Sequence, residues 1–172
     1  MAGRVFCKYN QDMKILTKKI KTLILEDQNQ IKLFRQGSIS QSDWVKKSKE
    51  MTSAFHDLIN KHGFPYKNLV PKNAYRSGIT LSLHSDLRVL KYIFSTYVKN
   101  VSPKQIDPEH KAMVIDKIRI LSHKLQLYGT QYKINKNKKV ELLPVENKKN
   151  LEKRRKEAGL QPLDEYLKLI NH

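Results

Sequence analysis

The sequence has one cysteine and no long apolar run, and each shortage excludes a class of protein. Cys7 cannot form an internal disulfide, and one thiol cannot build a cysteine-based zinc cluster. No stretch reaches the ~18 apolar residues that a membrane-spanning helix needs, so we expect no membrane span. The opening residues MAGRVFCKYN lack the apolar segment of a signal peptide, and we therefore expect a cytoplasmic protein.

Acidic residues are also scarce, which leaves a large excess of positive charge. The 172 residues contain 34 Lys and Arg against 16 Asp and Glu, a formal net charge of +18. Such a charge attracts nucleic acids, anionic lipid headgroups and phosphorylated small molecules. Lysine predominates over arginine, and Asn and Ile are frequent too, which an AT-rich genome produces without any functional demand. Both explanations of the charge stay open.

The hydrophobic pattern predicts a single domain with a mainly α (α+β) fold of about six to seven helices and one β-hairpin. Apolar residues at helical spacing, with Gly and Pro at the ends, predict helices over 10–36, 42–61, 73–84, 87–99, 108–122, 147–158 and 162–170. Alternating residues predict strands at 127–134 and 140–145 around a turn at 135–138, a hairpin near residues 127–145. The length fits one domain.

Several polar residues lie where a helix N-cap is expected. Ser42 or Asp43 would cap the second predicted helix, and Asp86 the fourth. Asp107 precedes Pro108, which is the usual order of an N-cap and a first-turn proline. These residues therefore have a structural explanation before any chemical one is considered.

One carboxylate interrupts the apolar face of the first predicted helix. Asp27 follows Leu23 by four residues and precedes Ile31 by four, so it faces the same side as both. A carboxylate on a buried face must be paired, hydrogen-bonded or protonated. We therefore expect a partner for Asp27, which has Gln28 beside it.

Short polar motifs follow one another along the rest of the chain. They are His62-Gly63-Phe64-Pro65, His84-Ser85-Asp86, Asp116-Lys117-Ile118, Gln126, Tyr128-Gly129-Thr130-Gln131, Arg154-Arg155, Gly159-Leu160, Pro162-Leu163 and Tyr166. In this order and spacing the chain resembles an uncharacterised bacterial family of small domains of unknown function, and Asp27-Gln28 is similar to its N-terminal Asp-Gln pair. Phe64 and Lys117 stand where the family has Trp and Arg. The resemblance implies no particular activity, because the family has none assigned.

Two imidazoles and three carboxylates among these motifs make up a candidate catalytic site. In one version His84 carries protons near neutral pH and is oriented by Asp86 or Asp116. In the other version His62, His84, Asp86 and Asp116 bind one divalent metal ion through nitrogen and oxygen. Within one helix His84 and Asp86 would point about 200° apart, but a break between two helices lets them converge.

Polar groups near this set are candidates for holding a ligand. The ligand-binding candidates are His62, Lys117, Arg119, Gln126, Tyr128, Gly129, Thr130, Gln131, Arg154 and Arg155. Cationic side chains suit an anionic group, and a glycine lets a ligand approach the backbone closely. The leading hypothesis is therefore a hydrolase or transferase that acts on a phosphate-bearing ligand.

Two further hypotheses stay open beside the enzyme. A non-catalytic module would bind nucleic acid or a partner protein through the basic stretch Lys133–Lys156, where Tyr132 would stack a base. No zinc finger, bipartite recognition helix or aromatic RNP-type motif is present, so this binding would be at most nonspecific. A toxin or immunity-type interaction protein is the third hypothesis, and the sequence predicts no oligomeric state.

Overall fold

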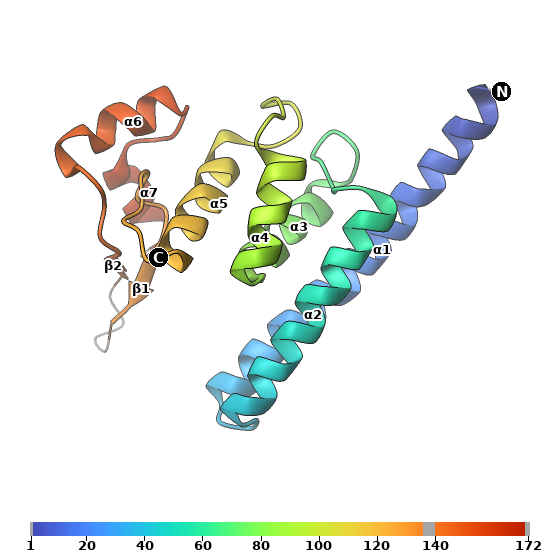
Figure 1. The fold of residues 1–172 in the computed structure, drawn as a ribbon, viewed down its shortest axis with the longest axis horizontal. Coiled ribbons are helices and arrows are strands. Elements are labelled where there is room, and N and C mark those ends of the chain that lie inside the picture. The colour runs from blue at the N-terminus through green and yellow to red at the C-terminus, as the bar shows by residue number, and fades with distance from the viewer. Residues whose placement is uncertain (1, 136–139, 171–172) are drawn as a thin grey trace. The chain divides into compact units, whose positions relative to one another are not determined.

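The computed structural model describes residues 2–135 and 140–170, and of residues 2–10 it describes the backbone only. Among these residues seven α-helices, two short helical turns of other types and one two-stranded hairpin confirm the expected mainly α fold (Figure 1). The contacts between residues group the chain into two compact units, Met1–Ile93 and Phe94–His172. The first is called unit 1 and the second unit 2.

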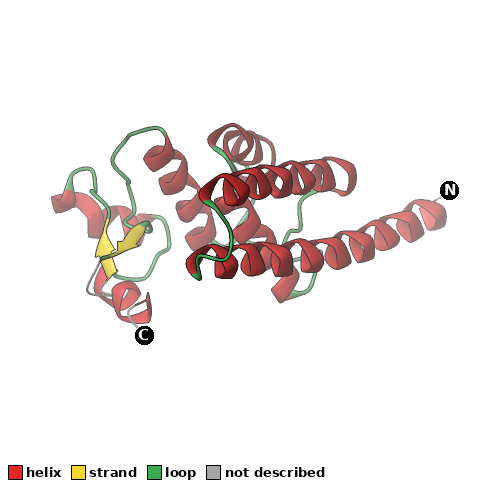
Figure 2. Cartoon of the chain, turned by 90° about the horizontal axis from the view of Figure 1, so that it is seen from below, coloured by secondary structure: helices red, strands yellow, loops and turns green. Residues whose placement is uncertain are grey.

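Unit 1 is built on a pair of long helices, α1 (Ala2–Arg35) and α2 (Gln41–His62). The two lie side by side in both views of the ribbon, and α1 also packs against α3 (Lys72–His84) (Figures 1 and 2). Phe34 and Trp44 stack with ring centroids 5.0 Å apart near the connection between the two helices. The first helix begins at Ala2 and not near residue 10, because helical structure continues ahead of the apolar stripe from which it was predicted.

The second helix is capped at both ends by bonds local to the chain. The Ser40 hydroxyl accepts a hydrogen bond from the Asp43 amide at 3.1 Å and donates one to Asp43 Oδ2 at 2.6 Å. Ser40 is therefore the N-cap, and the prediction of Ser42 or Asp43 was wrong because the hydroxyl that accepts from the Asp43 amide lies two residues before Ser42. At the other end Gly63, with φ of +86°, donates its N–H to the Ile59 carbonyl at 2.8 Å.

Helices α3 (Lys72–His84) and α4 (Leu87–Ile93) complete unit 1. Pro65 packs directly on α3 at Gly78, where an added Cβ would lie 2.4 Å from the Pro65 ring. Between the helices Ser85 is extended, so the predicted break is present. Asp86 Oδ1 accepts from the Val89 amide at 2.9 Å, which confirms Asp86 as the N-cap of α4.

Unit 2 begins with a π-helical turn, η1 (Phe94–Val98), that follows α4 directly along the chain. The predicted helix over 87–99 is therefore α4 plus η1. Next comes α5 (Pro108–Leu121), with Asp107 at its N-cap position and Pro108 in its first turn, as predicted. Two strands follow, β1 (Tyr132–Ile134) and β2 (Val140–Leu142).

The hairpin is antiparallel and shorter than predicted. Tyr132 pairs with Leu142 and Ile134 with Val140, and residues 127–131 lie outside the ladder (Figure 2). Of the turn predicted at 135–138, residues 136–138 lie outside the described residues. The chain then forms a 3₁₀ turn, η2 (Lys148–Asn150), and the helices α6 (Leu151–Glu157) and α7 (Leu163–Ile170). None of the described helices is long and apolar enough to cross a membrane.

Candidate functional site

The last residue of α3 forms a hydrogen bond with the carboxylate that interrupts the apolar face of α1. His84 Nδ1 lies 2.8 Å from Asp27 Oδ2, and the two residues are 57 positions apart in the sequence. The Gln28 amide also donates to Asp27 Oδ2, at 3.2 Å. The His84 side chain is 38% exposed and that of Asp27 is 13% exposed. Asp27 thus has the partner that its place on an apolar face requires, and the imidazole it holds still reaches solvent.

The other residues of the His84-Ser85-Asp86 motif hold the helix junction together. Ser85 is buried and donates its hydroxyl to the Leu81 carbonyl at 2.9 Å. Asp86 caps α4 through the Val89 amide. The carboxylate that orients His84 is therefore Asp27 and not Asp86, because the side chain of Asp86 turns toward the start of its own helix.

A second imidazole pairs with a second carboxylate of α1. His62 Nδ1 lies 3.0 Å from Asp12 Oδ1, and the His62 side chain is 6% exposed. Its other ring nitrogen, Nε2, is buried and has no hydrogen-bond partner among the described residues. Asp12 precedes Leu16 by four residues, so it extends the apolar stripe of α1 just as Asp27 does. The periodicity argument that singled out Asp27 applies equally to Asp12, although Asp12 was not predicted.

The His62–Asp12 and His84–Asp27 pairs are separate sites. Asp12 and Asp27 are 15 residues apart on one continuous helix, which at 1.5 Å per residue is about 22 Å. We expected His62, His84 and Asp86 to bind one metal ion together. They do not lie close enough to one another to do so. Within each unit, the described part of the chain holds no group of three His, Cys, Asp or Glu side chains suited to a metal ion.

Unit 2 is organised around one fully buried carboxylate. Asp116, on α5, is 0% exposed. Its oxygens accept hydrogen bonds from the amides of Leu127 at 2.7 Å, Tyr128 at 3.1 Å and Thr130 at 3.0 Å, and from the Thr130 hydroxyl at 2.9 Å. The four donors occupy both carboxylate oxygens and shape the loop over 127–131. Asp116 therefore has a structural role in the loop, and none of these bonds involves Arg119.

Glutamine side chains tie the same loop to the second strand. Gln126 is 0% exposed, donates to the carbonyls of Gln131 and Leu143, and accepts from the Gln131 amide at 2.8 Å. Gly129 has φ of +68°, and a Cβ added there would lie 3.4 Å from Leu163. The space beside Gly129, where we expected a ligand to approach, is thus filled by apolar side chains. The side chains of this motif therefore stabilise the loop that the motif forms.

The two consecutive arginines of α6 also turn toward the protein. Arg154 donates to the carbonyls of Leu127 at 2.9 Å and Asn147 at 3.2 Å, and to that of Glu146. Lys117 is half-buried, and burial lowers the pKa of its ammonium group. Arg119 donates to the Leu125 carbonyl at 2.6 Å and pairs with Glu146. These contacts use Arg119 and Arg154, two of the cations that we expected to hold an anion.

Arg155 is 2% exposed, and both Arg155 and Tyr166 donate hydrogen bonds to the loop over 127–131. Its guanidinium donates to the carbonyls of Tyr128 at 2.6 Å and Gln161 at 2.9 Å, and burial lowers its pKa. The Tyr166 hydroxyl donates to the Thr130 carbonyl at 3.0 Å, and burial raises its pKa to about 12. The pKa of Tyr166 in the folded protein exceeds its value of about 10 in the unfolded chain. The neutral Tyr166 hydroxyl therefore stabilises the fold below pH ~10, and this stabilisation is lost as the pH rises toward 12.

The comparisons with known proteins place the chain in one family. The profile of a family described as "Family of unknown function (DUF6624)" matches residues 47–172. The chain belongs to this family. Comparisons with curated proteins and with solved structures found no match. The DUF6624 match includes His62, His84 and every motif of unit 2, whereas Asp12 and Asp27 precede it.

The DUF6624 region therefore supplies the imidazoles of both pairs, His62 and His84, and α1 supplies the two carboxylates that hold them. The motif residues of unit 2 mostly bond to one another and to the backbone. Of all the sequence candidates, His84 alone combines a fixed orientation with an accessible ring. Gln28, which supports Asp27, had no predicted role.

Proposed function

We propose that this chain is an acid–base enzyme in which His84, held by Asp27, moves protons during hydrolysis of, or transfer from, a phosphate-bearing substrate. The observation that carries the proposal is the 2.8 Å contact between His84 Nδ1 and Asp27 Oδ2, made by an imidazole that is 38% exposed. An oriented histidine with one ring nitrogen left for the substrate is the usual arrangement of a general base.

The contact with Asp27 selects the tautomer of the imidazole. An ionised carboxylate only accepts hydrogen bonds, and Asp27 Oδ2 accepts from both His84 and Gln28. The hydrogen of neutral His84 is therefore on Nδ1, and the lone pair is on Nε2. That nitrogen can take up a proton, and the adjacent carboxylate stabilises the imidazolium that forms.

Charge supports an anionic substrate at this site. Unit 1 contains 17 Lys and Arg against 7 Asp and Glu, and unit 2 has 17 against 9. The positive charge is therefore not confined to the basic stretch of unit 2. A field of this sign raises the local concentration of phosphate-bearing molecules around unit 1.

The reaction would proceed as a displacement at phosphorus. His84 Nε2 takes the proton of the attacking water or alcohol while its oxygen forms the new P–O bond. The bond from phosphorus to the leaving oxygen breaks, and the imidazolium returns the proton to that oxygen. One proton thus enters and leaves His84 in each turnover, and Asp27 stays ionised throughout.

Replacing His84 with glutamine tests the proposal. We expect the wild-type chain to release p-nitrophenolate from p-nitrophenyl phosphate or bis(p-nitrophenyl) phosphate, with water or an added alcohol as acceptor. His84→Gln should lower kcat by roughly 10²–10⁴ and change KM little, because proton transfer is lost and binding is kept. The matched control is His56→Gln, which changes a histidine of α2. An unchanged rate in His84→Gln would exclude the dyad.

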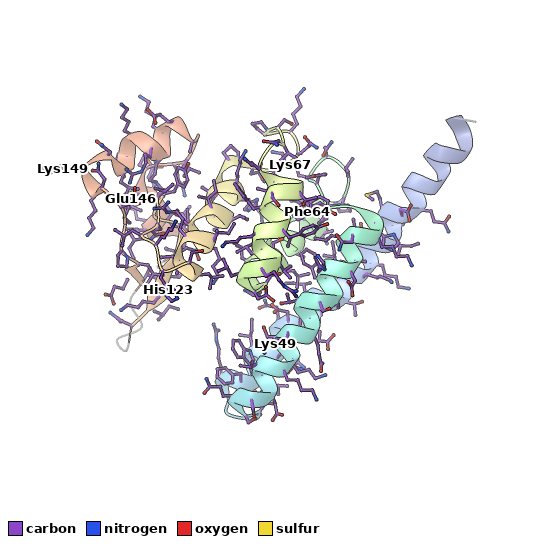
Figure 3. All side chains as sticks on the ribbon, viewed as in Figure 1. Lys49, Phe64, Lys67, His123, Glu146 and Lys149 are labelled. Atoms are coloured by element: carbon purple, nitrogen blue, oxygen red, sulfur yellow. The ribbon has the colours of Figure 1, made fainter. Side chains whose placement is uncertain are left out.

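The non-catalytic alternative has one observation in its favour. Four lysines of η2 and α6 are exposed, namely Lys148, Lys149, Lys153 and Lys156, and Figure 3 labels Lys149 at the start of this segment. Lys136, Lys138 and Lys139 of the same basic stretch lie outside the described residues. Arg154 and Arg155 bond inward, so reversing their charge would test the fold and not the binding.

The salt dependence of duplex DNA binding tests this alternative. A surface that contacts phosphates through these lysines should lose affinity steeply as salt rises. Changing all four lysines to glutamine should then reduce the slope of log K against log salt by about 0.9 for each lysine in contact. His84→Gln should leave the slope unchanged. The alternative is excluded if the four-lysine variant keeps the wild-type slope.

A further inference from the structure

A groove within unit 2 has mostly apolar walls. It lies between the loop ahead of α5, the first two turns of α5 and residues Tyr128 and Ala158. Its volume is about 300 Å³, which is at the lower end of the range of small-molecule sites in proteins. Val101, Ile106 and Ile115 are among the apolar residues of its walls. The groove therefore suits a small ligand with an apolar body.

The buried charges of unit 2 hold Tyr128 at the wall of this groove. The Tyr128 amide donates to Asp116 Oδ1 at 3.1 Å, and the Tyr128 carbonyl accepts from the Arg155 guanidinium at 2.6 Å. Asp116 is 0% exposed and Arg155 is 2% exposed. Two buried charged side chains thus fix both polar groups of the Tyr128 backbone.

The side chain of Tyr128 is the exception in its motif. The Thr130 hydroxyl donates to Asp116, and the Gln131 side chain donates to the Thr130 hydroxyl. The Tyr128 hydroxyl makes no hydrogen bond within the described residues, and its half-buried side chain lines the groove. Residues that bind ligands are commonly held in place by a supporting layer of hydrogen bonds. A ring supported in this way, with no task of its own in the loop, points to a ligand in the groove.

Lys111 gives the groove a positive end. It is the one charged side chain among the described residues that line the groove, since neither Asp107 nor Glu109 lines it. The Lys111 ammonium donates to the Lys99 carbonyl at 2.6 Å, and Lys99 is two residues, or at most about 7 Å, from Val101 on the groove wall. An ammonium group has three hydrogens, so two remain for a ligand. The positive end of the α5 dipole also favours an anion beside these first turns.

We propose that this groove binds a small carboxylate with an apolar body. The apolar body packs against Ile106, Ile115 and the ring of Tyr128, and the carboxylate lies beside the Lys111 ammonium. The site goes beyond the proposed activity and does not depend on it, because His84 and Asp27 belong to unit 1 and the groove to unit 2.

3-Phenylpropionate is a suitable probe, because it joins one carboxylate to an apolar ring. The Ile and Ala methyl resonances of the full-length ¹³C-methyl-labelled protein are followed by NMR while the probe is added. We expect saturable shifts of Ile106, Ala112 and Ile115, and none of Ile20 in unit 1. 3-Phenylpropionamide has the same size without the charge and should bind roughly fivefold more weakly. Propionate lacks the ring and should not saturate the same signals.

Lys111→Gln tests the charged end of the groove. Removing the charge should weaken 3-phenylpropionate binding by roughly fivefold, to the affinity of 3-phenylpropionamide, whose own affinity should not change. Lys104→Gln is the matched control, because it removes an exposed lysine of the same loop that does not line the groove. It should leave both affinities unchanged.

Ala158→Leu tests the location of the ligand. Ala158 directly follows α6 and lines the groove, so a larger side chain there fills part of the space and removes no contact. The affinity for the acid and for the amide should both fall by more than roughly tenfold. Ala54→Leu enlarges an exposed alanine of α2 and should change neither affinity. His84→Gln should also bind the probe as the wild type does, so this site is tested separately from the proposed activity.

Three results would overturn the proposal. They are the absence of saturable shifts at the groove methyls, equal affinities of the wild type for the acid and the amide, and wild-type affinity in Ala158→Leu. The methyl spectrum of each free variant shows whether it is folded. The comparison of the acid, the amide and propionate needs only the wild type, so the proposal is decided even if Ala158→Leu fails to fold.

Discussion

Asp116→Asn is expected to destabilise the protein by about 3–5 kcal/mol, although it changes one atom of one side chain. The Asp116 oxygens accept from three backbone amides and the Thr130 hydroxyl within a fully buried site. An asparagine NH₂ only donates, so on either side it would face N–H groups that then have no acceptor. Each buried donor left without a partner costs about 1–3 kcal/mol.

The effect should be seen first in the loop over 127–131. Hydrogen exchange of peptides that contain Leu127 and Thr130 should speed up, and the midpoint of urea unfolding by circular dichroism should fall. Asp164→Asn makes the same chemical change on the exposed surface of α7 and should cost less than about 1 kcal/mol. Wild-type stability with loss of turnover in Asp116→Asn would instead restore the catalytic role that the sequence suggested for Asp116.

Asp27→Asn is expected to lower kcat by roughly 10²-fold or more, and the Asp27→Asn, His84→Gln double variant should be no slower than the slower single variant. An asparagine in place of Asp27 can donate to His84 Nδ1 and so favours the tautomer whose hydrogen is on Nε2. Nε2 would then have no lone pair for the proton of the nucleophile. The two residues act as one unit, so their effects should not multiply.

Steady-state kinetics of the wild type and the three variants measure this coupling. Glu26→Gln is the matched control, because it neutralises the exposed carboxylate next to Asp27 and should leave kcat unchanged. Unfolding curves of each variant show that the protein is folded under the assay conditions. Effects that multiply in the double variant would mean that Asp27 acts separately from His84.

The features that follow from local chain chemistry could be predicted from the sequence. Periodic apolar residues located the helices, and the hairpin was placed correctly although its strands are shorter than predicted. Gly63 and Asp86 end and begin helices as expected, because caps are formed by neighbours within one turn. The anomaly of Asp27 was also visible, because a carboxylate on an apolar stripe breaks a periodic pattern.

The loop over 127–131 shows where local patterns fail. Its alternating residues predicted a strand, yet its amides bond to Asp116 and Gln126 and not to a neighbouring strand. Alternation reports which side chains are buried, whereas the partner of each amide depends on what packs against the loop. Arg154 and Arg155 were expected to hold a ligand, yet both donate to backbone carbonyls of the protein.

The sequence by itself determined a basic, mainly helical chain with the motifs of a family of unknown function, and it marked Asp27 as a residue in need of a partner. Only the tertiary structure decided that the partner is His84, that His62 belongs to Asp12, and that Asp116 holds a loop. The physical reason is the separation along the chain. Periodicity tells which face of a helix is buried, but the packing of α1 against α2 and α3 decides which residue, 50 or 57 positions away, meets each carboxylate.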